Sequence, residues 1–337
     1  MRASRRSRTP KPPAPPIEVS FPDLSAYAKG NTGIAYAWTF TTANAGPHVL
    51  LQALTHGNEV CGAIALDRYM RDGTRPTRGS LSLVFANVEA YRLFDPADPY
   101  SSRCIDEDFN RLWSDDVLEG SRDSVELRRA RELRPLYDAV DVLIDLHSMS
   151  EPCVPLALAG PRAKGLALAR SIGVPEHIII DEGHVAGKRL RDYGHFGEPD
   201  DPRNALLIEC GQHWERSAPE VAWQAVLRTL QHFEMADREW LMRELAPLAP
   251  PAQKVIEVTD VVTIGSDRFR FTFPVHGLQT IAEAGTVFAD DGGVPVRTPY
   301  ADCVLVMPTR KPKRGETAVR LARYVWESVG VEAPTDS

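Results

Sequence analysis

The chain has 337 residues, a hydrophobic content of 43%, a charged content of 25% and a formal net charge of −7. These values are ordinary for globular proteins and exclude a disordered chain or a fibre, and the sequence lacks the uninterrupted apolar run of about 18 residues that a transmembrane helix needs. The negative charge offers no general attraction to nucleic acid or anionic lipid, since both bind basic surfaces. We therefore expect a folded protein that binds neither nucleic acid nor membranes.

The chain begins with a basic, proline-rich segment, MRASRRSRTPKPPAPP. Its arginine pair is not followed by the apolar segment of an export signal, so we predict that residues 1–18 form a disordered tail. The five cysteines are an odd number, widely spaced and without a CxxC pair. This pattern indicates neither a disulfide framework nor a thiolate zinc cluster, and it favours the reducing cytoplasm.

Apolar runs along the first 210 residues predict strands buried on both faces, at 48–54, 81–86, 141–146, 154–159, 177–181 and 205–210. Helical apolar spacing lies between several of them, at 59–71, 124–140 and 161–172. This alternation predicts an α/β fold with a mostly parallel or mixed sheet flanked by helices.

A long amphipathic helix is predicted from about Pro219 to Leu245, and it ends at the proline-rich linker APLAPPAQK. We therefore predict a catalytic domain over 19–248 and a smaller C-terminal β-domain over 249–337. Short strands with glycine, proline and aspartate turns are expected at 254–264, 268–274, 285–293 and 301–308, followed by a closing helix at about 315–329.

Polar residues at three predicted strand ends carry the functional signal. His56 and Glu59 follow the run at 48–54, His147 follows the run at 141–146, and Glu209 lies within the run at 205–210. Ligands bind at the carboxyl ends of strands in open α/β sheets. Two histidines and a glutamate form a set that holds a catalytic zinc ion and leaves one position for water. Gly57, between the first two, would let the backbone approach the ion.

For His56 and Glu59 alone, a helix-cap histidine and a first-turn carboxylate are the simpler interpretation. A second histidine, His147, preceded by Asp145, favours the metal site, because metal-bound imidazoles commonly donate their other N–H to a carboxylate. Asp145 is therefore a candidate partner of His147.

A long connection over residues 85–113 contains Asn87, Arg103, Asn110 and Arg111 among several acids. Long ordered loops tend to be functional. An isolated Asn-Arg pair would be explained as part of a solvated loop, but the histidines make a functional loop the better interpretation.

Six motifs occur in order: THGNE (55–59), NxxA (87–90), Arg103, DFNR (108–111), DLHS (145–148) and IECG (208–211). On these motifs the sequence resembles the succinylglutamate desuccinylase/aspartoacylase family, which is related to the zinc carboxypeptidases. The resemblance covers roughly residues 48–215, and that family also carries a C-terminal β-domain.

The resemblance implies roles for nine residues. The zinc ligands would be His56, Glu59 and His147, with one zinc ion per chain. Glu209 would be the general base, and Arg103 would polarise the scissile carbonyl. The residues implied in substrate binding are Asn110 and Arg111 at the α-carboxylate, the active-site asparagine Asn87, and Tyr300 on the β-domain.

The chain also departs from the family pattern. Aspartoacylase-like enzymes place an arginine ten residues before the catalytic glutamate to hold the far carboxylate of the acyl group, and Pro199 occupies that position here. Arg203, Arg191 or Arg189 would have to substitute, or else the acyl group need not be acidic. Cys210, beside Glu209, is expected to be a packed strand residue.

The sequence thus predicts a zinc-dependent amidohydrolase that deacylates a small N-acyl amino acid, with a homo-oligomer left open. The alternative is a zinc carboxypeptidase acting on short peptides. A serine hydrolase built from Asp145, His147 and Ser148 is disfavoured, since neighbours on one strand do not readily adopt triad geometry and no GxSxG motif occurs. A non-catalytic zinc-binding module finds no support, because Glu209 and Arg103 are both present.

Overall fold

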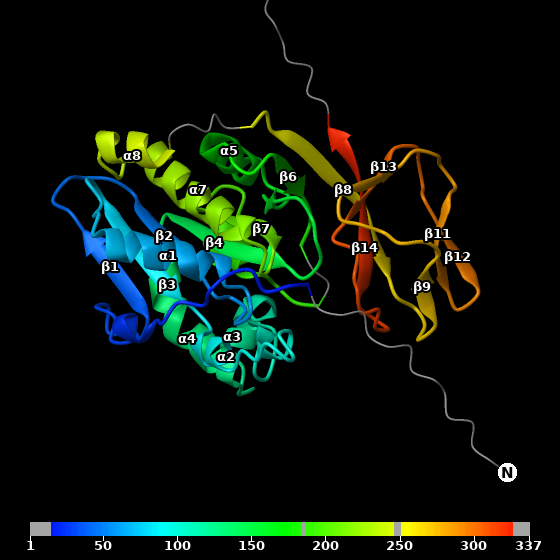
Figure 1. Ribbon diagram of the computed structural model, residues 1–337, viewed down its shortest axis with the longest axis horizontal. Coiled ribbons are helices and arrows are strands. Elements are labelled where there is room, and N and C mark those ends of the chain that lie inside the picture. Colours follow the sequence, from blue (N-terminus) through cyan, green and yellow to red (C-terminus); the bar gives the residue numbers. More distant parts are fainter. Residues whose placement is uncertain (1–14, 184–185, 246–250, 326–337) are drawn as a thin grey trace, which may run out of the picture.

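The computed structural model describes residues 15–183, 186–245 and 251–325, and an 11-stranded sheet runs through it (Figure 1). Its first seven strands, in spatial order, are β1 (Ala37–Thr41), β3 (Ser80–Phe85), β2 (His48–Ala53), β4 (Val142–Met149), β7 (Asn204–Gln212), β5 (Leu156–Leu158) and β6 (His177–Ile180). Strands β3, β2, β4 and β7 are parallel, whereas β1 and β5 run antiparallel to β3 and β7. The predicted mostly parallel sheet is confirmed, and β1 is an additional strand that the apolar pattern did not predict.

Helices cover both faces of this sheet. One face packs against α1 (Cys61–Asp72), α5 (Ala163–Ile172) and α7 (Ser217–His232), of which α1 and α7 lie side by side (Figure 1). The other face packs against α4 (Val125–Asp138) and the short helices α3 (Asp115–Leu118) and α6 (Gly194–Gly197). Successive strand residues serve opposite faces, so Leu50 and Leu51 belong to different core clusters. Both faces are therefore apolar, as the continuous hydrophobic runs predicted.

The C-terminal strands continue the same sheet. They are, in spatial order, β8 (Lys254–Thr263), β14 (Thr317–Val325), β13 (Cys303–Val306) and β10 (Gln279–Ile281), and β8 pairs in parallel with β6. A separate antiparallel sheet contains β9 (Phe269–Phe271), β11 (Val287–Asp291) and β12 (Val294–Arg297). The predicted boundary at 248/249 lies outside the described residues, and the division into two domains stays a prediction.

The predicted closing helix over 315–329 is wrong within the described residues. Residues 317–325 form β14, which pairs antiparallel with β8 and β13, and 318–322 are all buried. The stretch TAVRLARYV contains good helix formers, but pairing with two strands outweighs that modest local preference. Residues 326–329 lie outside the described part of the chain.

The single helix predicted over 219–245 is two helices, α7 and α8 (Arg238–Leu245). Glu234 adopts a left-handed φ of 54°, and the Met235 N–H donates to the Leu230 carbonyl at 2.8 Å, which ends α7. No glycine or proline marks this break. Asp237 then caps α8 by accepting a hydrogen bond from the Trp240 N–H at 2.9 Å.

Other predictions concern the chain as a whole. None of the helices in the described ranges has the length and apolar character needed to cross a bilayer. All five cysteines are free, in agreement with the prediction that they form no disulfide framework. Residues 1–14 of the predicted tail lie outside the described residues.

Candidate active site

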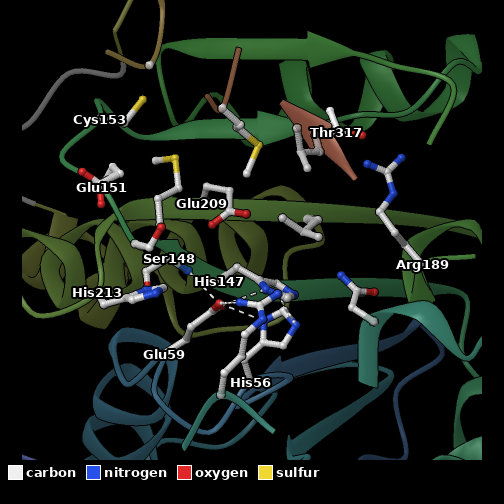
Figure 2. A pocket seen from close by; sticks show the side chains of 18 of the residues that line it. His56, Glu59, His147, Ser148, Glu151, Cys153, Arg189, Glu209, His213 and Thr317 are labelled. Carbon is white, nitrogen blue, oxygen red and sulfur yellow. Dashed lines mark hydrogen bonds and ion pairs between the residues drawn. The ribbon is translucent and has the colours of Figure 1, made fainter. Parts of the chain in front are cut away.

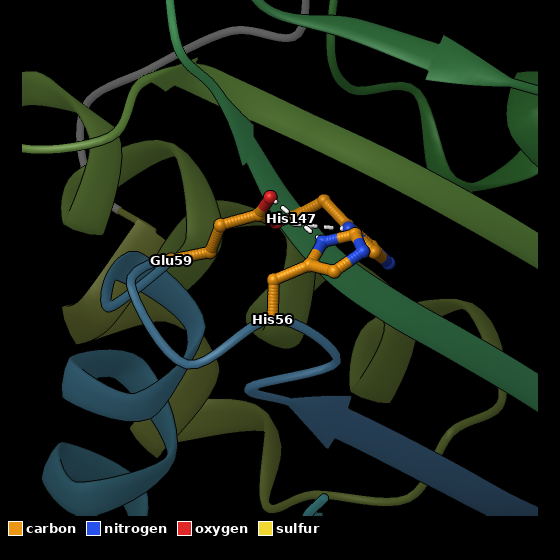
Figure 3. A group of neighbouring side chains, drawn as sticks. All are labelled: His56, Glu59 and His147. Carbon is orange, nitrogen blue, oxygen red and sulfur yellow. Dashed lines mark hydrogen bonds and ion pairs between the residues drawn. The ribbon is translucent and has the colours of Figure 1, made fainter. Parts of the chain in front are cut away.

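Three buried side chains meet near the carboxyl ends of β2 and β4: His56 and Glu59 follow β2, and His147 lies within the last residues of β4 (Figure 3). Glu59 lies between the imidazoles: its Oε1 is 2.8 Å from Nδ1 of His56, and its Oε2 is 2.9 Å from Nδ1 of His147. One candidate ligand atom from each of the three lies within 4.8 Å of the others. Two imidazole nitrogens and a carboxylate placed in this way can hold a metal ion.

The turn after β2 that carries His56 needs unusual backbone. Leu54 has a left-handed φ of 59°, which typically costs a non-glycine residue about 1–3 kcal/mol and persists where the surroundings enforce it. At Gly57 the close approach is made by protein backbone, because an added Cβ would lie 2.4 Å from the Tyr91 nitrogen. The Gly57 N–H also donates to the Arg103 carbonyl at 3.0 Å. The glycine therefore lets the loop that carries Arg103 pack against the metal-site turn.

An aspartate holds each histidine through its other ring nitrogen. Nε2 of His147 is 2.8 Å from Oδ2 of Asp145, as predicted, and Nε2 of His56 is 2.9 Å from Oδ1 of Asp108. These contacts orient both rings so that the Nδ1 atoms face Glu59. Asp108 belongs to the DFNR motif, but sequence reasoning gave it no role because nothing in the local spacing connects it to His56.

Arg103 lies beside this cluster. Its Nη1 donates to Glu59 Oε1 at 3.0 Å, and its Nη2 donates to Asp108 Oδ2 at 3.0 Å. Burial lowers the pKa of Arg103, but the carboxylates of Asp108 and Glu59 outweigh burial and raise the pKa above its ordinary value. The side chain is 39% exposed and lines the pocket. Arg103 therefore places a fixed positive charge next to the candidate ligands.

Glu209 faces the same pocket from β7, where it pairs with His147 of β4 (Figure 2). Its Oε2 has no hydrogen-bond partner among the described residues. Burial raises the pKa of Glu209 to about 8. An unpartnered carboxyl group with a pKa close to neutral pH is suited to exchange a proton.

Asn110 and Arg111 also line this pocket. The side-chain oxygen of Asn110 accepts a hydrogen bond from the Leu190 N–H at 2.9 Å, so it fixes the neighbouring loop. Arg111 donates from Nη1 to the Asn110 carbonyl at 2.7 Å, and no acidic side chain of the described residues lies within ion-pair distance of it. Burial lowers the pKa of Arg111, and the carboxylate of Asp108 only partly opposes this.

Asn87 and Tyr300 lie apart from these residues and are not among the side chains that line the pocket. Asn87 caps α2 (Val88–Arg92) and donates to Glu126 Oε1 at 3.0 Å. The Tyr300 hydroxyl, in the turn between β12 and β13, bonds to the hydroxyl of Thr259 on β8. The positions of Asn87 and Tyr300 therefore do not support the prediction that these residues contact the substrate.

Of the three arginines considered as replacements at the acyl end, Arg189 alone lines the pocket. Its two Nη atoms donate to the Asp181 carboxylate at 2.8 and 2.9 Å, so the forked pair of N–H donors of this guanidinium is already occupied. Arg203 pairs with Asp201 at 2.6 Å, and Arg191 donates to backbone carbonyls.

The structure does not assemble the serine triad. The ring nitrogens of His147 bond to Asp145 and Glu59, whereas Ser148 Oγ is 2.9 Å from Nδ1 of His213. Burial lowers the pKa of His213 to about 4, so this pocket-lining histidine is neutral at pH 7. Sequence reasoning missed His213.

Sequence reasoning also missed two residues of β14, Thr317 and Arg320, which line the pocket opposite the metal cluster. Figure 2 shows Thr317 across the pocket from His56 and Glu59. The only sequence signal was an arginine within the apolar run TAVRLA, and the prediction of a helix there hid its meaning.

Comparison with known proteins agrees with this geometry. Residues 45–236 match the model of the succinylglutamate desuccinylase/aspartoacylase catalytic domain. Aspartoacylase of Mus musculus is 34% identical over 103 residues, which are 28% of this chain and 31% of that protein. A probable aspartoacylase of Parasynechococcus marenigrum (strain WH8102) is 32% identical over 152 residues, which are 41% of this chain and 46% of that protein. The aligned region thus spans less than half the length of either relative.

The solved structures extend the likeness to nearly the whole fold. Succinylglutamate desuccinylase from Vibrio cholerae has a TM-score of 0.64 at 18% identity and covers 87% of this chain and 95% of its own. In this chain, the buried group that could hold a metal ion lies at the carboxyl ends of parallel strands, where open α/β sheets bind their ligands. The chain belongs to the succinylglutamate desuccinylase/aspartoacylase family, whose members are deacylases that hydrolyse amide bonds.

Proposed function

We propose that this protein is a zinc-dependent amidohydrolase that removes the acyl group from a small N-acyl amino acid. The observation that carries the proposal is that the His56–Glu59–His147 group shares one pocket with Glu209 and Arg103. The donor set fits zinc, because the aspartates behind both imidazoles leave two nitrogens and a carboxylate facing one point. A cytoplasmic location is part of the same proposal and is supported by the free cysteines.

The chemistry that zinc supplies in such a site is activation of a water molecule and polarisation of the carbonyl. Two residues of this chain carry out the remaining steps, which are proton transfer and stabilisation of the developing charge. Glu209 takes the proton from the attacking water and passes it to the leaving amine nitrogen. Arg103 stabilises the negative charge that develops on the carbonyl oxygen, because its guanidinium is held in place by Glu59 and Asp108 before the reaction begins.

Arg111 binds the carboxylate next to the scissile amide. It is a half-buried cation in the pocket without an acidic partner among the described residues, and its planar fork matches a carboxylate bidentately. Asn110 supports this role by fixing the adjacent loop at Leu190. The substrate carboxylate then supplies the negative charge that pairs with the Arg111 guanidinium.

Turnover of an N-acetyl amino acid and of a dipeptide with the same C-terminal residue tests the reaction class. We expect the zinc-loaded protein to hydrolyse the N-acetyl amino acid with the higher kcat/KM. A clear preference for the dipeptide would instead support the carboxypeptidase alternative, since both reactions use the same metal, base and arginine.

Amidation of the substrate carboxylate tests the role of Arg111. It should lower kcat/KM by about ten- to a hundredfold, the scale of a charged hydrogen bond. The Arg111→Lys variant should lose a similar factor, because the charge remains but the fork is lost. Exposed Arg323 provides the control, and Arg323→Lys should leave kcat/KM unchanged. Equal turnover of the amide and the free acid would contradict this role.

A further inference from the structure

A buried carboxylate without a basic partner lies in the first turn of α4. Glu126 is fully buried, and no lysine, arginine or histidine of the described residues lies within ion-pair distance of it. Moving a charge out of water is costly unless hydrogen bonds replace the lost solvation. Glu126 must therefore be stabilised by hydrogen bonds, and all of its partners come from other segments of the chain.

Three successive backbone N–H groups of the loop over residues 104–108 bind this carboxylate. Its Oε1 accepts a hydrogen bond from the Ile105 N–H at 2.6 Å. Its Oε2 accepts hydrogen bonds from the N–H groups of Asp106 and Glu107 at 3.0 and 3.2 Å. Successive backbone N–H groups that face one side form a concavity that binds anions. Here the protein itself supplies the anion.

The loop in turn satisfies the first residues of α4. Oδ2 of Asp106 accepts a hydrogen bond from the Val125 N–H at 2.8 Å, and Oε1 of Glu107 accepts one from the Ser124 hydroxyl at 2.5 Å. The helix is fixed to the sheet by buried apolar residues such as Leu133. Hydrogen bonds in both directions therefore fix the loop to an element that cannot easily move.

Asn87 binds the same carboxylate from the end of another strand. Its Nδ2 donates to Glu126 Oε1 at 3.0 Å, while its Oδ1 accepts a hydrogen bond from the Ala90 N–H at 3.3 Å and caps α2. The Asn87 N–H donates to the carbonyl of Leu54 at 2.8 Å, at the start of the turn that carries His56. Asn87 therefore connects Glu126 to the metal-site turn.

The loop that Glu126 holds is flanked by two residues of the candidate active site. Arg103 directly precedes it, and Asp108 is its last residue. These two side chains bond to each other at 3.0 Å, and Asp108 also bonds to His56 at 2.9 Å. A shift of residues 105–107 would displace both side chains, and a misplacement of about 1 Å can cost an enzyme about a hundredfold in rate.

We infer that Glu126 is a positioning residue, which holds the loop over 104–108 so that Arg103 and Asp108 keep their places beside the candidate metal ligands. Asn87 acts through Glu126 and does not need to touch the substrate, which agrees with its place outside the pocket. This inference rests on the proposed function, in which Arg103 stabilises the charge that develops on the carbonyl oxygen.

A double-mutant cycle with Arg103 tests the inference, with kcat and KM measured on an N-acetyl amino acid at saturating zinc. Glu126→Gln should lower kcat by about ten- to a hundredfold, because an amide offers one acceptor atom in place of two. In the Arg103→Met background the same change should lower kcat by about twofold or less, since no arginine remains to be positioned. A merely structural role would give the same factor in both backgrounds.

Glu132→Gln is the matched control, because Glu132 lies on the same helix with its side chain 46% exposed. It should leave kcat unchanged. If Glu126→Gln does not fold, Asn87→Ser decides the question, since serine can still cap α2 but does not reach Glu126. We expect kcat to fall by about three- to tenfold with KM unchanged. A residue that contacts the substrate would raise KM instead.

Amide hydrogen exchange tests the hold on the loop without turnover. The amides of residues 105–107 should exchange at least about tenfold faster in Glu126→Gln, whereas those of α7 should keep their rates. Three results would overturn the inference: unchanged exchange at 105–107, unchanged kcat, or an equal loss of kcat in both backgrounds. Failure of the proposed function is seen separately, as the absence of hydrolysis by the unchanged zinc-loaded protein, and exchange then still decides whether Glu126 holds the loop.

Discussion

The two walls of the pocket differ in how the sequence encodes them. One wall is made by residues at the carboxyl ends of the parallel strands β2, β4 and β7, which carry or precede His56, His147 and Glu209. The other wall is made by β14, whose place in the sheet depends on pairing with β8 and β13. The comparison teaches that local sequence patterns place the residues of the first wall, whereas strand pairing between distant parts of the chain places those of the second.

The largest effect should follow from removing the base in the first wall. Glu209→Gln should keep the fold and the metal but lower kcat by at least about 10²-fold, because an amide cannot accept the proton of water. Steady-state kinetics at saturating substrate measure this. Glu151 lines the same pocket but pairs with Arg310 at 2.9 Å, so Glu151→Gln is the control and should change kcat little. Turnover close to that of the unchanged protein would place the base elsewhere.

A smaller effect, on zinc affinity, should follow from weakening the hydrogen bond that orients His56 in the first wall. Asp108→Asn weakens the hydrogen bond that orients His56, so zinc affinity should fall by about 10- to 100-fold. Competition with a chelator of known affinity measures the change. The exposed Asp116 gives the control, since Asp116→Asn should leave zinc affinity as it was. Unchanged affinity in Asp108→Asn would mean that Asp108 does not orient a metal ligand.

Adding one methyl group at Gly57, in the turn that carries His56, should lower the stability of the fold. Gly57→Ala would place a Cβ 2.4 Å from the Tyr91 nitrogen, against backbone that cannot easily shift. We expect a loss of about 1–3 kcal/mol in the free energy of unfolding, measured by urea denaturation. At Gly265 the nearest atom to an added Cβ is the end of the Asp291 side chain, so Gly265→Ala should cost less. Equal losses would show that the Gly57 contact is not special.

The first wall could be predicted from sequence because its residues sit in local patterns. His56 and Glu59 follow one apolar run, and His147 comes at the end of another. To bring them together, it is enough that the two runs form neighbouring parallel strands, because such strands end at the same edge of the sheet. The partner of His147, Asp145, is two residues away and was predicted for that reason. Asp108 was not, because the contact with His56 depends on how a loop 52 residues away folds back.

The second wall could not be predicted because long-range pairing decides it. The run that contains Arg320 has good helix formers, and only its position between β8 and β13 makes it a strand. The break between α7 and α8 was missed for a related reason, since Glu234 adopts a left-handed conformation that sequence patterns assign to glycine. Tertiary contacts outweighed local preference in both cases.

Reconstitution with zinc tests the central claim, that the His56–Glu59–His147 group is a metal site that drives amide hydrolysis. Metal-free protein would be titrated with zinc while bound metal and hydrolysis of an N-acyl amino acid are both measured. We predict that activity rises with bound zinc and saturates at one ion per chain. The double variant His56→Ala, His147→Ala should bind no zinc at the concentration that saturates the unchanged protein, and it should stay inactive. Stoichiometric zinc binding by the double variant, or full hydrolysis by the metal-free protein, would contradict the account.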